Sequence, residues 1–170
     1  LVTRHIPLKN VAKGLNAQKI FSTIYFTSSG LKSLFAVKNP QIAVCGLNPH
    51  ASDNGLIGDE ESRLIIPAIK KAQGKGIRAE GPFPADTIFN KAREGSYDCV
   101  VCMYHDQGLI PLKLSGFQDA VNITLGLTFV RTSPGHGTAF DIAGKGKANP
   151  ASFIASLKIA IQCTKNLKKA

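Results

Sequence analysis

The chain has 170 residues, of which 44% are apolar and 19% are charged, a balance that excludes disordered and fibrous proteins. No run approaches the roughly eighteen apolar residues of a membrane helix, and the start resembles no cleavable signal, so we expect a cytoplasmic protein without membrane partners. Lys and Arg (21) exceed Asp and Glu (11) to give a net charge of +10, but scattered basic residues without interleaved aromatics favour an anionic small substrate over nucleic acid.

Alternating helical and apolar segments predict an α/β domain with a largely parallel sheet. A helix is expected over residues 16–35 and a strand over residues 41–45. A second helix begins at the acidic run 59–61, whose carboxylates favour the positive end of the helix dipole, and ends near Gly74 or Gly76. Pro67 predicts a kink within this helix.

The segment 97–104 is the strongest predicted strand, and it is apolar on both faces, as is typical of a central strand. A short strand around 77–79 and a rigid turn over 81–87 that continues into one or two helical turns precede it. The predicted elements that follow are a brief helix (109–114), a hairpin that makes the sheet mixed (121–125 and 129–131), a Gly-rich loop (134–150) and an amphipathic helix (151–167).

Three of the four histidines, His5, His50 and His105, directly follow or lie just past apolar runs. Ligands of open α/β sheets bind beyond the carboxyl ends of strands, so these imidazoles are candidates to converge. Three neutral imidazoles with an open position are typical of a catalytic divalent metal, with zinc favoured. Asp86 and Asp106 are available to orient or supplement them. An ordinary surface or hydrogen-bonded histidine is the alternative for each residue taken alone.

The four cysteines lie inside apolar runs and are expected to be reduced core residues. Cys99 and Cys102 have the spacing of zinc knuckles and redox dithiols. Residues three apart in a strand point to opposite faces, however, so core packing is favoured over a shared metal or a disulfide.

Lys113, Asn122 and Arg131 form a second polar group near the His105 segment. Arg offers a planar fork for carboxylate or phosphate, and Lys a mobile charge that also exchanges protons. Asn122 lies between two apolar residues of a predicted strand, and alternation places it on the same side as Thr124. A solvated surface residue is the alternative for each. The Gly-rich loop matches neither standard phosphate-binding motif.

Together these strings resemble the carboxyl-terminal half of the 4-hydroxythreonine-4-phosphate dehydrogenase family, of the isocitrate/isopropylmalate dehydrogenase superfamily. The resemblance covers essentially the whole chain, and the loop from His136 looks like the adenosine-binding loop of the superfamily. The matching strings are Thr3-Arg4-His5-Ile6-Pro7-Leu8, Cys45-Gly46-Leu47-Asn48-Pro49-His50, Gly81-Pro82-Phe83-Pro84-Ala85-Asp86-Thr87, Tyr104-His105-Asp106-Gln107-Gly108 and Val121-Asn122-Ile123-Thr124-Leu125-Gly126.

The resemblance implies an isopropylmalate dehydrogenase-like, three-layer α/β fold with a mixed, mainly parallel sheet, forming one domain of a normally two-domain enzyme. Residues 1–150 would form the metal- and substrate-binding, dimer-forming domain. Residues 151–170 would form a helix that packs on an amino-terminal domain that the chain lacks. Leu1-Val2-Thr3 is accordingly expected to be the tail of a strand from a longer chain.

The resemblance also assigns roles to the polar groups. It implies that the three histidines hold a divalent metal shared between the subunits of a homodimer, that the Lys113 group binds the phosphorylated substrate, and that NAD(P) is the cofactor. Zinc is the expected metal, with cobalt, manganese and magnesium as alternatives. The expected cofactor-binding residues are His136, Gly137, Thr138, Ala139 and Asp141.

The implied reaction is the oxidation of 4-hydroxythreonine 4-phosphate to a β-keto acid that decarboxylates to 3-amino-2-oxopropyl phosphate, in vitamin B6 biosynthesis. The catalytic candidates are Lys113, Asp106 and Asp86, with Lys113, or Asp106 through a water, transferring protons. Two alternatives stay open. One is a dehydrogenase of erythronate or threonate 4-phosphate, and the other is an inactive, truncated dimerisation and metal-binding module.

Overall fold

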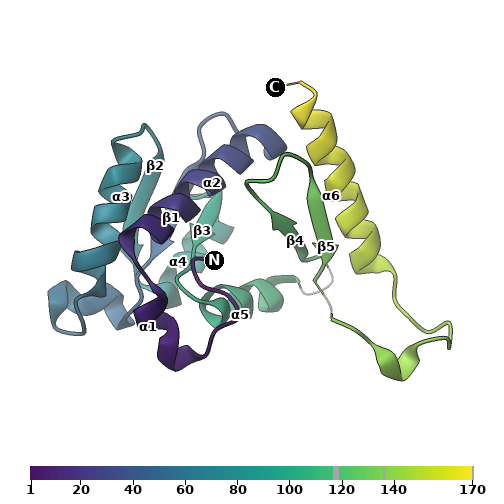
Figure 1. Ribbon diagram of the computed structural model, residues 1–170, viewed down its shortest axis with the longest axis horizontal. Helices are drawn as coiled ribbons and strands as arrows, with labels where there is room; N and C mark the ends of the chain where they lie inside the picture. The colour runs from purple at the N-terminus through teal and green to yellow at the C-terminus, as the bar shows by residue number, and fades with distance from the viewer. Residues whose placement is uncertain (117–118, 136, 170) are drawn as a thin grey trace.

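A three-stranded parallel sheet forms the centre of the computed structural model, which describes residues 1–116, 119–135 and 137–169 (Figure 1). Strand β1 (Gln41–Cys45) lies between β2 (Arg78–Phe83) and β3 (Cys99–Val101) and is parallel to both. Because parallel neighbours end at the same edge, the segments that follow β1 and β3 leave the sheet side by side.

Helices cover both faces of this sheet. Helix α2 begins where the Asn16 side chain accepts a hydrogen bond from the backbone N–H of Lys19 (2.8 Å), which confirms the predicted cap. The α-helices are α1 (Val11–Gly14), α2 (Ala17–Phe35), α3 (Ile66–Gln73), α4 (Ala85–Arg93), α5 (His105–Gly116) and α6 (Ala151–Leu167). The other helical turns are η1 (Leu8–Asn10), η2 (Pro49–Gly55), the π-helical η3 (Glu61–Ile65) and η4 (Phe140–Ile142).

The core has two layers, one on each side of β1. Ile42 and Val44 point to the face covered by α2 and α3, where Ile24 is fully buried. Ala43 and Cys45 point to the opposite face, against α4. Strand β1 is therefore apolar on both faces, which confirms the expected three-layer α/β arrangement.

The carboxyl-terminal part is built differently. Strands β4 (Val121–Thr124) and β5 (Arg131–Pro134) form an antiparallel hairpin, and α6 packs beside it and against α2 (Figure 1). The sheet content is thus both parallel and antiparallel, but the hairpin forms a sheet of its own. Helix α6 is confirmed, and its apolar residues Phe153, Ile154, Leu157 and Ile161 are between 44% and 59% exposed.

Several sequence predictions are corrected. Segment 97–104, expected to form a central strand, contributes only the short edge strand β3, and Val100 and Cys102 of this segment pack in the core beside α4. Residues 81–83, predicted to turn, continue β2 through a cis Gly81-Pro82 bond. Helix α5 begins at His105 and not at Leu109, and the second hairpin strand lies two residues later than expected.

The second predicted helix has an irregular first part. The chain forms the π-helical η3 before α3, and Pro67 lies in the first turn of α3, where a missing N–H costs least. The change in winding at this point takes the place of a kink inside one continuous helix. The helix ends at Gly74, as expected.

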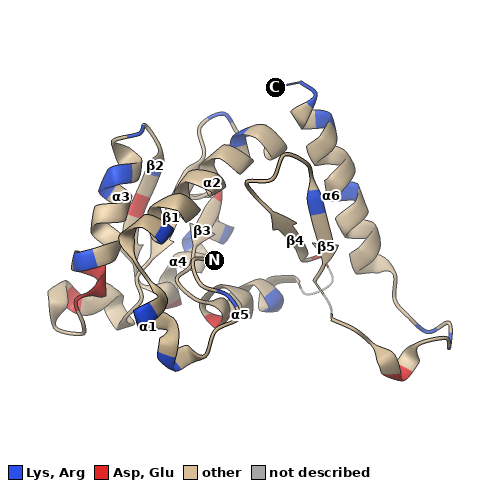
Figure 2. Cartoon of the chain, viewed as in Figure 1, with Lys and Arg blue, Asp and Glu red and all other residues tan. Residues whose placement is uncertain are grey.

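The distribution of charged residues and the length of the apolar helices agree with the expectations drawn from the composition. Lys and Arg are spread over helices at opposite ends of the molecule, including α1, α3 and α6 (Figure 2). Within the described residues, no helix has both the length and the apolar character to cross a membrane. All four cysteines are free, as predicted, and three of them are buried.

Candidate metal and anion site

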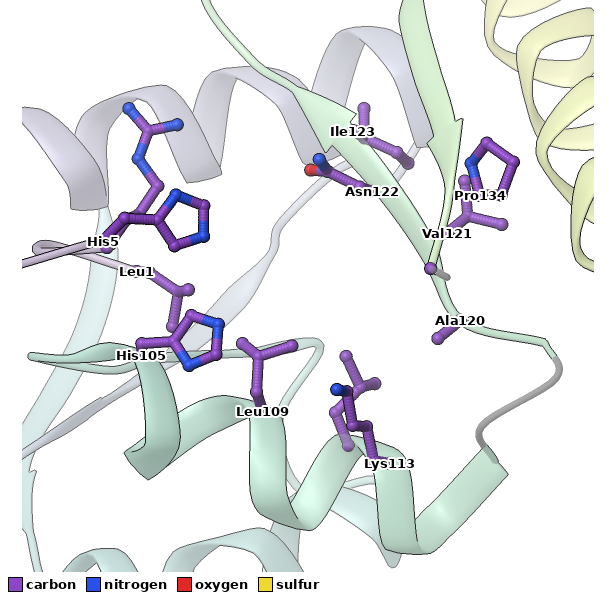
Figure 3. Close-up of a pocket in the computed structure, with 13 residues that line it drawn as sticks. Leu1, His5, His105, Leu109, Lys113, Ala120, Val121, Asn122, Ile123 and Pro134 are labelled. Atoms are coloured by element: carbon purple, nitrogen blue, oxygen red, sulfur yellow. The ribbon is translucent and has the colours of Figure 1, made fainter. Parts of the chain in front are cut away.

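A cavity of about 450 Å³ lies between the amino-terminal segment, α5 and the β4–β5 hairpin (Figure 3). It brings together four of the residues singled out in the sequence, although they are more than a hundred positions apart at the extremes. Those four are His5, His105, Lys113 and Asn122, and Arg4, Leu1 and Leu109 are among their neighbours in the lining.

His5 and His105 face each other at the mouth of this cavity, with ring centroids 5.6 Å apart (Figure 3). The pairing follows from the backbone. The N–H groups of Val2 and Thr3 donate to the carbonyls of Cys102 (2.8 Å) and Met103 (3.0 Å), so the first residues lie along the end of β3. The two histidines therefore leave the same edge of the sheet, as the sequence argument expected.

Asp106 orients one of these rings. Its carboxylate lies 2.6 Å from Nδ1 of His105, in the first turn of α5. With Nδ1–H donating to the carboxylate, Nε2 of His105 keeps its lone pair for a metal ion. This contact is the one that the orienting role predicted for Asp106 requires.

His50 lines a separate cavity of about 320 Å³, together with Asp86, Tyr104 and Gln107. Tyr104 also lines the hollow that holds His5 and His105. In the part of the chain that the structure describes, no group of three or more His, Cys, Asp and Glu side chains is placed to hold a metal ion. One chain thus joins two of the three predicted ligands, and Asp86 accompanies the third.

Two of the three predicted anion-binding residues line the same cavity as His5 and His105, and the third does not. Lys113, on α5, and Asn122, on β4, both line the 450 Å³ cavity (Figure 3). Arg131 lies opposite Thr124 in the hairpin and donates to its hydroxyl (2.9 Å). Thr124 and Asn122 line an adjoining cavity of about 530 Å³, so Arg131 is held beside that second space.

The predicted cofactor loop extends away from the rest of the chain (Figure 1). Gly137, Thr138 and Ala139 are exposed, and Asp141 lies in the short turn η4, where its carbonyl accepts a hydrogen bond from the Lys145 ammonium group (2.6 Å). His136 lies outside the described residues.

Three residues at the site were missed by sequence reasoning. Arg4 lines the cavities of both 450 and 530 Å³, and its position beside His5 was the available signal. Gln107 is buried between the ends of β1 and β3. Glu61 is only 1% exposed and holds the loop after β1, whereas its acidic run predicted a helix-dipole role. Asp59, just before η3, is the exposed residue of that run that forms an ion pair, with Arg63.

The thiols of Cys45 and Cys99 are poor metal ligands, whereas a hydrogen bond with Cys45 lowers the pKa of Cys102. Burial raises the pKa of Cys99 to about 11, and a hydrogen bond to Cys102 together with burial raises the pKa of Cys45. Metal binding by cysteine requires the thiolate, so Cys45 and Cys99 are weaker candidate donors than the imidazoles and carboxylates at this edge of the sheet.

Comparison with known proteins places the chain in a defined group. The family model described as "Pyridoxal phosphate biosynthetic protein PdxA" matches residues 1–160. The 4-hydroxythreonine-4-phosphate dehydrogenase of Bradyrhizobium diazoefficiens is 57% identical over 159 residues, which are 94% of this chain and 46% of that protein. The D-threonate 4-phosphate dehydrogenase of Salmonella typhimurium is 53% identical over 161 residues, which are 95% of this chain and 49% of that protein.

A solved structure agrees. The crystal structure of 4-hydroxythreonine-4-phosphate dehydrogenase from Klebsiella pneumoniae matches with a TM-score of 0.88 and 48% identity, over 95% of this chain and 49% of that chain. The chain therefore spans about half the length of the relatives that it matches.

Proposed function

This chain belongs to the PdxA family of pyridoxal phosphate biosynthetic proteins, and we propose that it supplies the metal- and substrate-binding part of a dehydrogenase. The substrate would be 4-hydroxythreonine 4-phosphate, oxidised with NAD(P) to a β-keto acid that decarboxylates to 3-amino-2-oxopropyl phosphate. The observation that carries the proposal is the facing pair of His5 and His105 at a cavity that also contains Lys113 and Asn122.

The donor set fits a divalent cation such as zinc, cobalt or manganese. Two imidazoles face one another, and the carboxylate of Asp106 leaves Nε2 of His105 available. A cation held by these residues would polarise the substrate's oxygens, and a bound nicotinamide would supply the hydride acceptor. Magnesium is a weaker candidate, because it prefers oxygen ligands.

A second copy of the chain is the proposed source of the third ligand, His50. Large apolar side chains are exposed close after each histidine in the sequence: Leu8 (73%), Leu56 (83%) and Ile110 (58%). We propose that these side chains lie in the interface of a homodimer. A homodimer that covers them would bring His50 of one chain to the His5 and His105 of the other.

Charge complementarity supports a phosphorylated substrate. Arg4 and Lys113 bring two cationic side chains to the cavity, and Asn122 adds an amide that both donates and accepts hydrogen bonds. Arg131 lies beside the adjoining space, where it would anchor an anionic group of the substrate. Lys113, or Asp106 through a water, is the candidate to transfer protons.

The substrate is tested by measuring NAD(P) reduction with 4-hydroxythreonine 4-phosphate and with threonate or erythronate 4-phosphate side by side. We expect the first to be preferred. Preference for the sugar acids would assign the chain to the reaction named for its Salmonella typhimurium relative. Zinc binding without turnover of either substrate would favour the alternative of a dimerisation and metal-binding module.

The shared metal site is tested by mixing two variants. His50→Ala and His105→Ala homodimers each lack one ligand at both sites and are expected to lose zinc affinity by more than the 10–100-fold typical of removing a group that only hydrogen-bonds to a ligand. In mixed dimers, one site keeps all three histidines if the ligands come from both chains. Recovered zinc content on mixing supports the shared site, and no recovery contradicts it. Full zinc retention by His105→Ala would end the three-histidine proposal.

A further inference from the structure

We infer that Glu61 and Gln107 are positioning residues that hold the loop carrying His50 against the first turn of α5, which carries His105. The inference rests on the proposed function only in treating the two histidines as ligands. Glu61 lines neither the 450 Å³ cavity nor the 320 Å³ cavity of His50, and Gln107 lines only the latter. Both residues make hydrogen bonds to the backbone that leads to the histidines.

Glu61 organises the loop that follows β1. One carboxylate oxygen accepts the backbone N–H groups of Leu47 (2.8 Å) and Asn48 (2.7 Å), and the other accepts the Asn48 side-chain amide (2.9 Å). The residue is 1% exposed. Burying a carboxylate is unfavourable unless hydrogen bonds compensate for its lost hydration, so the burial of Glu61 depends on this conformation of the loop.

Gln107 ties the same loop to the element that begins at His105. Its side-chain oxygen accepts the N–H of Met103 (2.7 Å), and its side-chain nitrogen donates to the carbonyl of Gly46 (2.7 Å). The side chain therefore bridges the residues just after β3 and just after β1. The starting points of the two histidine-bearing segments are thus fixed relative to each other.

The backbone beyond Asn48 needs such support. His50 begins a turn in which five consecutive non-glycine residues have positive φ, from 44° to 70°. Left-handed backbone is unfavourable for residues with a Cβ and persists where surrounding structure over-determines it. The turn packs directly on Gly46, where an added Cβ would lie 2.9 Å from Cα of Ala51. The hydrogen bonds of Glu61 and Gln107 hold this Gly46–Asn48 platform.

The test compares Glu61→Ala with Glu60→Ala, a matched control whose carboxylate contacts the loop through the Asn48 side chain (2.8 Å). Two readouts are measured: the exchange of the Leu47 and Asn48 amides in metal-free protein, and a titration with Co²⁺ alone, followed by its visible absorption. Glu61→Ala is expected to speed exchange of both amides, to alter the absorption spectrum and to weaken Co²⁺ binding on the order of 10–100-fold. Glu60→Ala is expected to stay close to wild type.

Conservative variants keep the test decisive if Glu61→Ala does not fold. Glu61→Gln retains an oxygen for both backbone N–H groups and should restore most of the protection. Gln107→Glu keeps the oxygen that accepts the Met103 N–H, but it replaces the side-chain N–H that donates to the Gly46 carbonyl with a second oxygen. The two oxygens repel each other, so this variant should weaken Co²⁺ binding.

The inference is overturned if Glu61→Ala matches Glu60→Ala in amide exchange and in Co²⁺ affinity. It is also overturned if Glu61→Ala lowers only the urea midpoint and leaves the Co²⁺ spectrum unchanged, because the role is then structural alone. A wild-type protein that binds no Co²⁺ contradicts the proposed metal site. In that case the amide exchange alone decides whether Glu61 restrains the loop.

Discussion

The parallel-sheet region and the carboxyl-terminal region of this chain differ in where they bury apolar surface. In the first, both faces of β1 are covered, and residues such as Ile24, Val44 and Ile65 are fully buried. In the second, the hairpin has no fully buried side chain, and the buried residues of α6 are Ser152, Ser156 and Cys163. The candidate site lies where the two regions meet. One side of the site is therefore formed by a well-packed region and the other side by a weakly packed one.

Because of this difference, the two halves of the site are held in place to different degrees. His105 and the loop carrying His50 are anchored to the sheet by buried hydrogen bonds from Glu61 and Gln107. Asn122 and Arg131 are on a two-stranded hairpin, an element of marginal stability by itself. We expect the metal-binding side to be rigid and the anion-binding side to be adaptable.

The largest expected effect comes from the sheet core. Ile24→Ala removes a side chain that is 0% exposed and should lower the free energy of unfolding by about 2–5 kcal/mol. Ile161→Ala, on α6, removes a side chain that is 48% exposed and should cost under about 1 kcal/mol. Urea denaturation followed by circular dichroism measures both. Equal losses would contradict the contrast between the regions.

A pair of glycines gives the next contrast. At Gly46, an added Cβ would lie 2.9 Å from Cα of Ala51 and 3.0 Å from a carboxylate oxygen of Glu61, so Gly46→Ala should cost about 1–3 kcal/mol. At Gly137, an added Cβ meets nothing within 4 Å, so Gly137→Ala should leave the urea midpoint near that of wild type. If Gly46→Ala is as well tolerated as Gly137→Ala, the loop after β1 is not tightly packed.

A smaller effect is expected at the contact between the regions. The Asn166 side chain, on α6, donates to the carbonyl of Leu34 (2.7 Å), on α2. Asn166→Ala should cost about 1 kcal/mol and speed amide exchange in α6 while leaving β1 unchanged. Lys165→Ala, at an exposed position of the same helix, is the control. Slower exchange in α6, or equal acceleration in β1, would contradict this assignment.

The last expected effect is confined to alkaline pH. The pKa of Cys99 is raised by burial from 9.0 to about 11. As the pH rises from 9.0 toward about 11, the thiol ionises first in the unfolded chain, so stability is full below pH 9.0 and falls across this window. Cys99→Ala should make the urea midpoint fall less steeply over that range. An unchanged slope would show that the Cys99 thiol is not protected by folding.

The local sequence pattern was sufficient to predict many structural features of this protein. The cap at Asn16, strand β1, helix α6 and the reduced state of the cysteines followed from residue type and periodicity. The placement of His5 and His105 at one edge followed from a general rule of parallel sheets, since both residues come just after strand-like runs. These features depend on neighbours in the chain.

Other features depended on packing between distant segments. The three residues of the acidic run 59–61 are chemically similar, yet only Glu61 is buried. The reason is that backbone N–H groups of the loop after β1 point to that one position. His50 lies in a different cavity from the other two histidines, at the start of a left-handed turn that no periodicity signals. The position of β3 at the sheet edge was likewise set by which partners lie beside it. Residue type and spacing determined which groups are present, and long-range contacts decided which of them meet.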